Sequence, residues 1–116
     1  MHALIIEDNH LIVEGIEDLL RGLGYSSFDI ATREADAVQA AEDRCPDLIT
    51  ADDRLTDGSG IKAVRVICQR RAIPVVIVAA VDDLTSADIP HAVLLPKPFS
   101  EVDFRRAVAD AVELIR

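Results

Sequence analysis

The fold is decided by the stretch Leu4-Ile5-Ile6-Glu7-Asp8, in which a short aliphatic run passes directly into two acids. The pattern recurs at Leu48-Ile49-Thr50-Ala51-Asp52, and a third apolar run, Val93-Leu94-Leu95, comes shortly before Lys97. Short apolar runs with polar ends are typical of strands that are buried inside a sheet. If these strands lie side by side and parallel, the three acids and the lysine meet at one edge of the sheet.

Three acids gathered at one edge repel one another unless a cation or protons lie among them. Carboxylate oxygens are the ligands that Mg²⁺ prefers, so Glu7, Asp8 and Asp52 are candidate metal ligands. A carboxylate in such a site can also act as a nucleophile and take up a phosphoryl group. A single acid at a strand end is usually a loop residue or a helix cap, but three acids together with Lys97 favour a functional site.

Composition narrows the class of protein. The chain has 116 residues, which predicts a single domain over 1–116, and half of them are hydrophobic with few aromatic rings, which predicts an aliphatic core. The formal charge of −9 argues against nucleic acid or an anionic membrane as a direct partner, because phosphate groups are bound by basic surfaces. The acidic balance instead favours a bound cation and a partner protein with a basic surface.

The chain carries no signal for a membrane or for export. No apolar run reaches the ~18 residues of a membrane span. The start, Met1-His2-Ala3-Leu4, lacks the basic region of a signal peptide, so we expect a cytoplasmic protein. Cys45 and Cys68 have no paired motif, and we expect both to be small buried thiols in a reducing compartment.

Hydrophobic periodicity predicts strands and helices that alternate along the chain. Ile12, Ile16 and Leu19 recur at helical spacing after Asn9, a natural N-cap, and Thr32 is predicted to cap the second helix. We expect strands at 3–6, 28–31, 47–51, 75–79 and 92–95, helices at 10–22, 33–44, 60–71 and 100–115, and at most a short helix at 84–89.

This alternation predicts an α/β fold, a doubly wound parallel sheet of five strands with right-handed crossovers and helices on both faces. In such sheets the ligand site lies at the carboxyl ends of the strands, where the strand order reverses. Glu7, Asp8, Asp52 and Lys97 all occupy predicted strand ends. The architecture and the chemistry therefore point to the same place.

Over its whole length the chain resembles a response-regulator receiver domain of two-component signalling. The matching strings are Ile5-Ile6-Glu7-Asp8-Asn9, Pro46-Asp47-Leu48-Ile49-Thr50-Ala51-Asp52, Leu55-Thr56-Asp57-Gly58-Ser59-Gly60 and Leu95-Pro96-Lys97-Pro98-Phe99. Each string is common alone, but four in this order and at this spacing are specific. The resemblance implies the flavodoxin-like (CheY-like) fold with strand order 2-1-3-4-5.

The resemblance also implies a role for each site residue. Asp52 would be the phosphoacceptor, and Lys97 would pair first with Asp52 and then with the phosphoryl group. Asp8 would bind Mg²⁺ directly, Glu7 would act through water, and the backbone carbonyl of Arg54 would complete the protein ligands together with Asp52. The family also implies a cis peptide bond between Lys97 and Pro98.

The chain departs from the family at the positions that usually couple phosphorylation to a change of shape. Ala79 stands where receivers usually carry Ser or Thr, and Leu94 stands where they usually carry an aromatic residue. The segment between Ala79 and Lys97 is short, so the fourth helix of the family should be short or absent. Thr56 replaces the proline common in the loop after Asp52, which we interpret as a minor change.

These observations leave three hypotheses. The first is a receiver that accepts a phosphoryl group from a histidine kinase or histidine phosphotransfer protein, which docks on the helix at 10–22. This receiver would act on an unknown downstream protein and would be a monomer or weak dimer. The second is a phosphorylation-independent binding module with a degenerate receiver fold. The third is an aspartyl-phosphate phosphohydrolase, which is disfavoured because Arg54 stands where that class needs a second acid. We therefore expect the protein to have no enzymatic activity other than the gain and loss of its own phosphoryl group.

Overall fold

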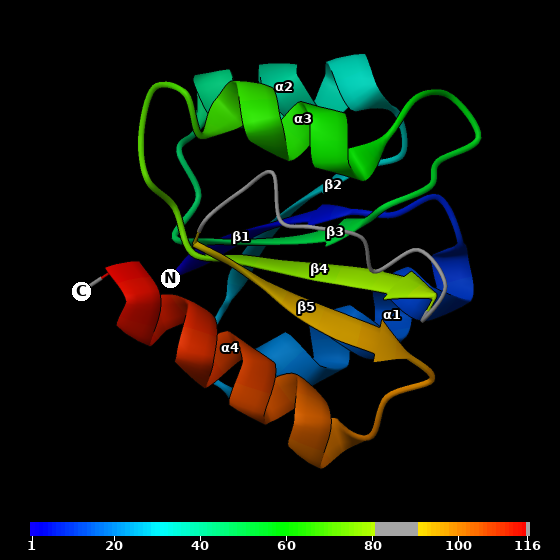
Figure 1. The fold of residues 1–116 in the computed structure, drawn as a ribbon, viewed down its shortest axis with the longest axis vertical. Coiled ribbons are helices and arrows are strands. Elements are labelled where there is room, and N and C mark those ends of the chain that lie inside the picture. Colours follow the sequence, from blue (N-terminus) through cyan, green and yellow to red (C-terminus); the bar gives the residue numbers. More distant parts are fainter. Residues whose placement is uncertain (81–90, 116) are drawn as a thin grey trace.

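Five parallel strands form the centre of the computed structural model, which describes residues 1–80 and 91–115 (Figure 1). The strands are β1 (His2–Ile6), β2 (Ser27–Ala31), β3 (Leu48–Asp52), β4 (Val75–Ala80) and β5 (Ala92–Lys97). They pair in the order β2-β1-β3-β4-β5. The predicted doubly wound, flavodoxin-like sheet is therefore confirmed, including its strand order.

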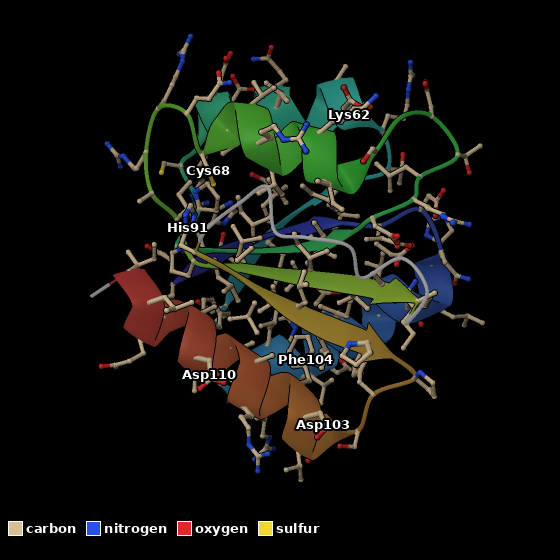
Figure 2. The ribbon with its side chains drawn as sticks, viewed as in Figure 1. Lys62, Cys68, His91, Asp103, Phe104 and Asp110 are labelled. Carbon is tan, nitrogen blue, oxygen red and sulfur yellow. The ribbon has the colours of Figure 1, made fainter. Side chains whose placement is uncertain are left out.

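Helices cover both faces of this sheet (Figure 1). The described residues form α1 (His10–Gly22), α2 (Glu34–Asp43), α3 (Gly60–Ile67) and α4 (Glu101–Ile115). Helices α1 and α4 lie on one face, and α2 and α3 lie on the other. Phe104 of α4 is fully buried under the first face and points toward the sheet (Figure 2).

The alternation of side chains along β1 explains why the sheet has two cores. Ala3 and Ile5 belong to the core beneath α1 and α4, whereas Leu4 and Ile6 belong to the core beneath α2 and α3. Successive side chains of a strand point to opposite faces, so a strand covered on both sides is apolar throughout. This is why the buried strands read as continuous aliphatic runs in the sequence.

The register of the strands aligns their carboxyl ends. Ile6, the last residue of β1, pairs with Ala51 of β3, and Asp52 pairs with Val78 of β4. The turn after β1 and the end of β3 therefore lie next to each other at one edge of the sheet. This is the edge at which the sequence predicts a functional site.

The helix and strand bounds agree with the sequence-based expectations within a few residues, and the structure differs from those expectations in four respects. Helix α3 ends at Ile67, and β5 continues to Lys97, two residues beyond the predicted end. The predicted cap at Thr32 is wrong, because Arg33 occupies the N-cap of α2 and makes no side-chain cap bond. Cys45 is exposed, contrary to prediction, and the predicted short helix at 84–89 lies outside the described residues.

The described helices include none that is long and apolar enough to cross a membrane. The longest of them, α4, buries only one stripe of residues against the sheet and exposes the rest. Its buried residues are Phe104, Ala107, Val108 and Ala111.

Candidate functional site

Three carboxylates meet at the predicted edge of the sheet. One oxygen from each of Glu7, Asp8 and Asp52 lies within 4.8 Å of the others. Glu7 and Asp52 are almost fully buried, with 2% and 8% of their surface exposed, whereas Asp8 is half-buried. Buried carboxylates this close together need a compensating positive charge or shared protons.

Glu7 shows the cost of burying an acid in this cluster. Burial, with a further contribution from the negative charge of Asp52, raises the pKa of Glu7 from 4.5 to about 7. Its Oε2 accepts hydrogen bonds from the backbone amides of Asp8 at 2.9 Å and Asn9 at 3.1 Å, which hold the side chain in place. An acid that keeps its proton near neutral pH is one whose proton a divalent cation can replace.

Asp8 is held by the loop that follows β3. Its Oδ2 accepts hydrogen bonds from both the backbone amide and the hydroxyl of Thr56, each at 2.6 Å. These two donors, first the hydroxyl and then the amide, lower the pKa of Asp8. Asp8 therefore stays ionised and is available as a ligand for a cation.

Asp52 lies between a cation and a backbone donor. Its Oδ2 is 3.2 Å from the Nζ of Lys97, at the end of β5, and its Oδ1 accepts a hydrogen bond from the amide of Arg54 at 3.3 Å. The peptide bond between Lys97 and Pro98 is cis, as predicted. Asp52 thus has both the lysine and the two other acids close to it.

Two glycines allow the loop between β3 and α3 to approach the site. Gly58 has a φ of +97°, a conformation that side chains rarely adopt. A Cβ at Gly60 would overlap the backbone carbonyl oxygen of Asp52, so only glycine lets α3 begin this close to β3. Both glycines therefore permit the turn into α3.

The start of α2 holds the far side of the same loop. Arg33 Nε lies 3.0 Å from Asp57 Oδ2, and the amide of Ser59 donates to Glu34 Oε1 at 2.9 Å. Ser59 also caps α3 by accepting from the amide of Lys62. The loop is therefore attached to α2 on one side and to Asp8 on the other.

The arrangement fits a divalent cation of the Mg²⁺ type. Its donors are carboxylate oxygens, which suit a small hard ion, and burial beside Asp52 raises the pKa of Glu7. Lys97 supplies a positive charge next to Asp52 that would also attract an anionic phosphoryl donor. A divalent cation in the acidic cluster, together with the lysine, could neutralise the charge of a phosphoryl group.

The structure brings together Glu7, Asp8, Asp52 and Lys97, as predicted, whereas the two switch positions lie in β4 and β5. Ala79 is buried and Leu94 is half-buried, and both lie in the core beneath α2 and α3. Sequence reasoning missed Thr56, which it interpreted as a minor substitution. The available signal was its position four residues after Asp52, in a loop that has to turn back beside β1.

His2 has structural contacts at the opposite end of β1. Its ring nitrogens lie 2.8 Å from Ser27 Oγ and 3.0 Å from Asp29 Oδ2, so it ties β1 to β2. His2 therefore takes no part in the acidic site.

Comparison with known proteins points to one family. The profile of the response regulator receiver domain matches residues 3–109. The phyllosphere-induced regulator PhyR of Methylorubrum extorquens is 35% identical over 113 residues, which cover 94% of this chain and 42% of that protein. The KDP operon regulatory protein KdpE of Escherichia coli is 34% identical over 93% of this chain and 50% of its own length. The chain thus spans about half the length of these curated relatives.

Solved structures agree with the sequence matches. The receiver domain of Erythrobacter litoralis PhyR superimposes with a TM-score of 0.82 at 33% identity, covering 97% of this chain and 89% of that one. A response regulator receiver protein of Sinorhizobium medicae gives a TM-score of 0.88 over 100% and 97% of the two chains. The second match is only 20% identical and supports the fold alone.

Proposed function

The chain belongs to the response-regulator receiver family, and we propose that it accepts a phosphoryl group on Asp52 in two-component signalling or a phosphorelay. The donor is a histidine kinase or a histidine phosphotransfer protein. One observation carries the proposal: Asp52 lies 3.2 Å from Lys97 Nζ and belongs to one cluster with the carboxylates of Glu7 and Asp8.

The chemistry requires charge to be neutralised on both reactants. A carboxylate attacks an anionic phosphoryl donor poorly because both are negative. Mg²⁺ held by Asp8, Asp52 and the backbone carbonyl of Arg54, with Glu7 acting through water, would supply positive charge to the phosphoryl oxygens. Lys97 contributes a second positive charge from the end of β5.

The transfer itself is a simple exchange of bonds. An oxygen of Asp52 forms a bond to phosphorus, the bond between phosphorus and the donor's histidine nitrogen breaks, and its electron pair stays on that nitrogen. The ammonium of Lys97 then pairs with the new phosphoryl group in place of the free carboxylate. Hydrolysis by water returns Asp52 and inorganic phosphate.

The signal that follows has to differ from that of an ordinary receiver. Ala79 offers no hydroxyl to the phosphoryl group and Leu94 offers no aromatic ring that could turn inward. The loss of one hydrogen bond to a charged acceptor, about 1.5–3 kcal/mol, weakens retention of the phosphoryl group or its effect on shape. We propose that the output is a contact with another protein, reached without the usual pair of switch residues.

The same two substitutions favour a second candidate, a receiver fold that binds a partner without being phosphorylated. The charged site counts against it, because a decayed switch has no need to keep three acids and a lysine together. The two candidates differ in whether Asp52 is chemically modified.

Intact-mass measurement separates them. Incubation with acetyl phosphate and Mg²⁺ should add about 80 Da, the mass of one phosphoryl group, to the wild-type protein. Asp53→Asn, which changes the neighbouring acid, should gain the same mass, whereas Asp52→Asn should gain none. No gain in the wild type, or an equal gain in Asp52→Asn, would reject the phosphoacceptor and leave the binding module.

A further inference from the structure

We propose that Thr56 is a positioning residue for the divalent cation, because its amide and hydroxyl together fix Asp8 and the loop after β3 relative to each other. The inference rests on the proposed function, since it concerns the same cation site. Thr56 would thus belong to the site as a hydrogen-bond donor to one of its carboxylates.

The first observation is that both Thr56 donors converge on one atom. The amide and the hydroxyl each lie 2.6 Å from Oδ2 of Asp8, although the two residues are 48 positions apart in the chain. Two short bonds to one oxygen fix both the position and the rotation of the carboxylate. Asp8 can then present its other oxygen, Oδ1, to a cation.

Glu7 follows the same pattern on the other side of the cluster. Its Oε2 accepts two backbone amides, those of Asp8 and Asn9. In each of the two acids, therefore, one carboxylate oxygen accepts two hydrogen bonds from the protein. Carboxylates that bind metals are commonly held in this way by hydrogen bonds from a second layer of groups.

The second observation is that the same contact fixes the loop that carries a further ligand. The carbonyl of Arg54, a proposed cation ligand, is two residues before Thr56 in the same loop. The ion pair of Arg33 with Asp57 and the bond from Ser59 to Glu34 attach the far side of this loop to α2. The bonds from Thr56 to Asp8 attach its near side to the turn after β1, so they set the distance between Asp8 and the Arg54 carbonyl.

Of the two donors to Asp8, only the hydroxyl depends on the identity of the side chain at position 56. Any residue other than proline could supply the amide, but only threonine or serine adds a hydroxyl close enough to the backbone to reach the same oxygen. A proline would supply neither donor. Valine has nearly the same shape as threonine and keeps the amide, so Thr56→Val removes the hydroxyl alone.

The sign of the effect distinguishes positioning from competition. If Thr56 positions Asp8 for the cation, removal of the hydroxyl weakens Mg²⁺ binding. If Thr56 instead competes with the cation for Asp8, removal of the hydroxyl strengthens it. Loss of a group that orients a metal ligand typically weakens binding 10- to 100-fold, and because Thr56 is exposed we expect the lower end, about tenfold.

Calorimetric titration with MgCl₂ tests this on the wild type, Thr56→Val and Thr56→Ser. We expect Mg²⁺ to bind about tenfold more weakly to Thr56→Val. Thr56→Ser keeps the hydroxyl and should bind Mg²⁺ within about threefold of the wild type. Melting in EDTA shows whether each variant is folded before the cation is added.

The outcomes separate this inference from the proposed function. Equal or tighter binding in Thr56→Val, or a loss in Thr56→Ser as large as that in Thr56→Val, would overturn the role of Thr56 while leaving a phosphoacceptor site in place. Absence of Mg²⁺ binding in the wild type would overturn both.

Discussion

Replacement of Glu7 by glutamine should make the protein more stable at alkaline pH. Glu7 is almost fully buried beside Asp52, and burial together with that neighbouring charge raises its pKa to about 7. The folded protein therefore has to ionise a buried acid as the pH rises. Glutamine has the same size, and its carbonyl oxygen can accept the amides of Asp8 and Asn9 that Glu7 Oε2 accepts now.

The direction of the pH effect follows from the pKa of Glu7 in each state. In the unfolded chain Glu7 loses its proton near pH 4.5, whereas in the folded protein it keeps it until about pH 7. Between these values the folded state binds more protons, so the free energy of unfolding falls as the pH rises. The full loss is up to about 3 kcal/mol, reached above pH 7, since each pKa unit corresponds to about 1.4 kcal/mol.

Urea unfolding of the metal-free protein at several values from pH 5 to pH 8 measures this effect. Wild type should lose up to about 3 kcal/mol relative to Glu7→Gln across this range, while the two should be similar at pH 5. Glu14→Gln changes an exposed glutamate of α1 and should follow the wild type. Saturating Mg²⁺ should restore wild-type stability at pH 8, because a ligand that binds only the folded state stabilises it.

Parallel curves for wild type and Glu7→Gln would refute this reasoning. They would mean that the buried carboxyl ionises without cost and that the acids do not repel one another in the folded protein.

Three further predictions concern other residues of the site. Lys97→Met removes the cation 3.2 Å from Asp52, and the rate of labelling by acetyl phosphate, followed by intact mass, should fall at least about tenfold; an unchanged rate would exclude a role for the ammonium. Gly60→Ala places a methyl group against the Asp52 carbonyl and should lower the free energy of unfolding in urea by about 2–3 kcal/mol. Gly15→Ala, in open space on α1, should raise it by about 0.5–1 kcal/mol, and equal effects of the two changes would contradict the close approach of α3 to β3. Ala79→Ser adds a hydroxyl at the end of β4, and the labelled protein should lose phosphate about tenfold more slowly; loss at the wild-type rate would show that this position does not reach the phosphoryl group.

The sheet could be predicted from the sequence because its signal is local. The aliphatic runs that form β1 and β3 end in Glu7 and Asp52, and a buried strand has to be apolar on both faces. Once five strands alternate with helices, few topologies remain, and the carboxyl ends of the central strands must lie at one edge. The acidic cluster follows because Glu7, Asp8 and Asp52 all lie at the carboxyl ends of these strands.

The contacts that complete the site could not be predicted because they join distant segments through loops. Thr56 meets Asp8, and Arg33 pairs with Asp57, only after the chain has folded. Loop side chains carry no periodicity from which their partners could be inferred. The wrong cap at Thr32 has the same origin, since the first amide of α2, on Glu34, donates to the backbone of Asp57 in another loop.

Tertiary pairing also explains why β5 is longer than its apolar run predicts. Pro96 and Lys97 pair with Ala79 and Ala80 of β4, although proline is a poor strand residue. This pairing carries Lys97 to the end of the sheet, where it reaches Asp52. The extension of β5 is therefore part of how the site is assembled.

The most direct test of the central claim is a titration with Mg²⁺ that follows the backbone amide signals by NMR. Saturable shifts should concentrate at residues 7–9 and 52–56, and Asp52→Asn should bind Mg²⁺ much more weakly. Shifts that never saturate, or that centre on the exposed acids of α4 and leave residues 7–9 and 52–56 unmoved, would contradict it.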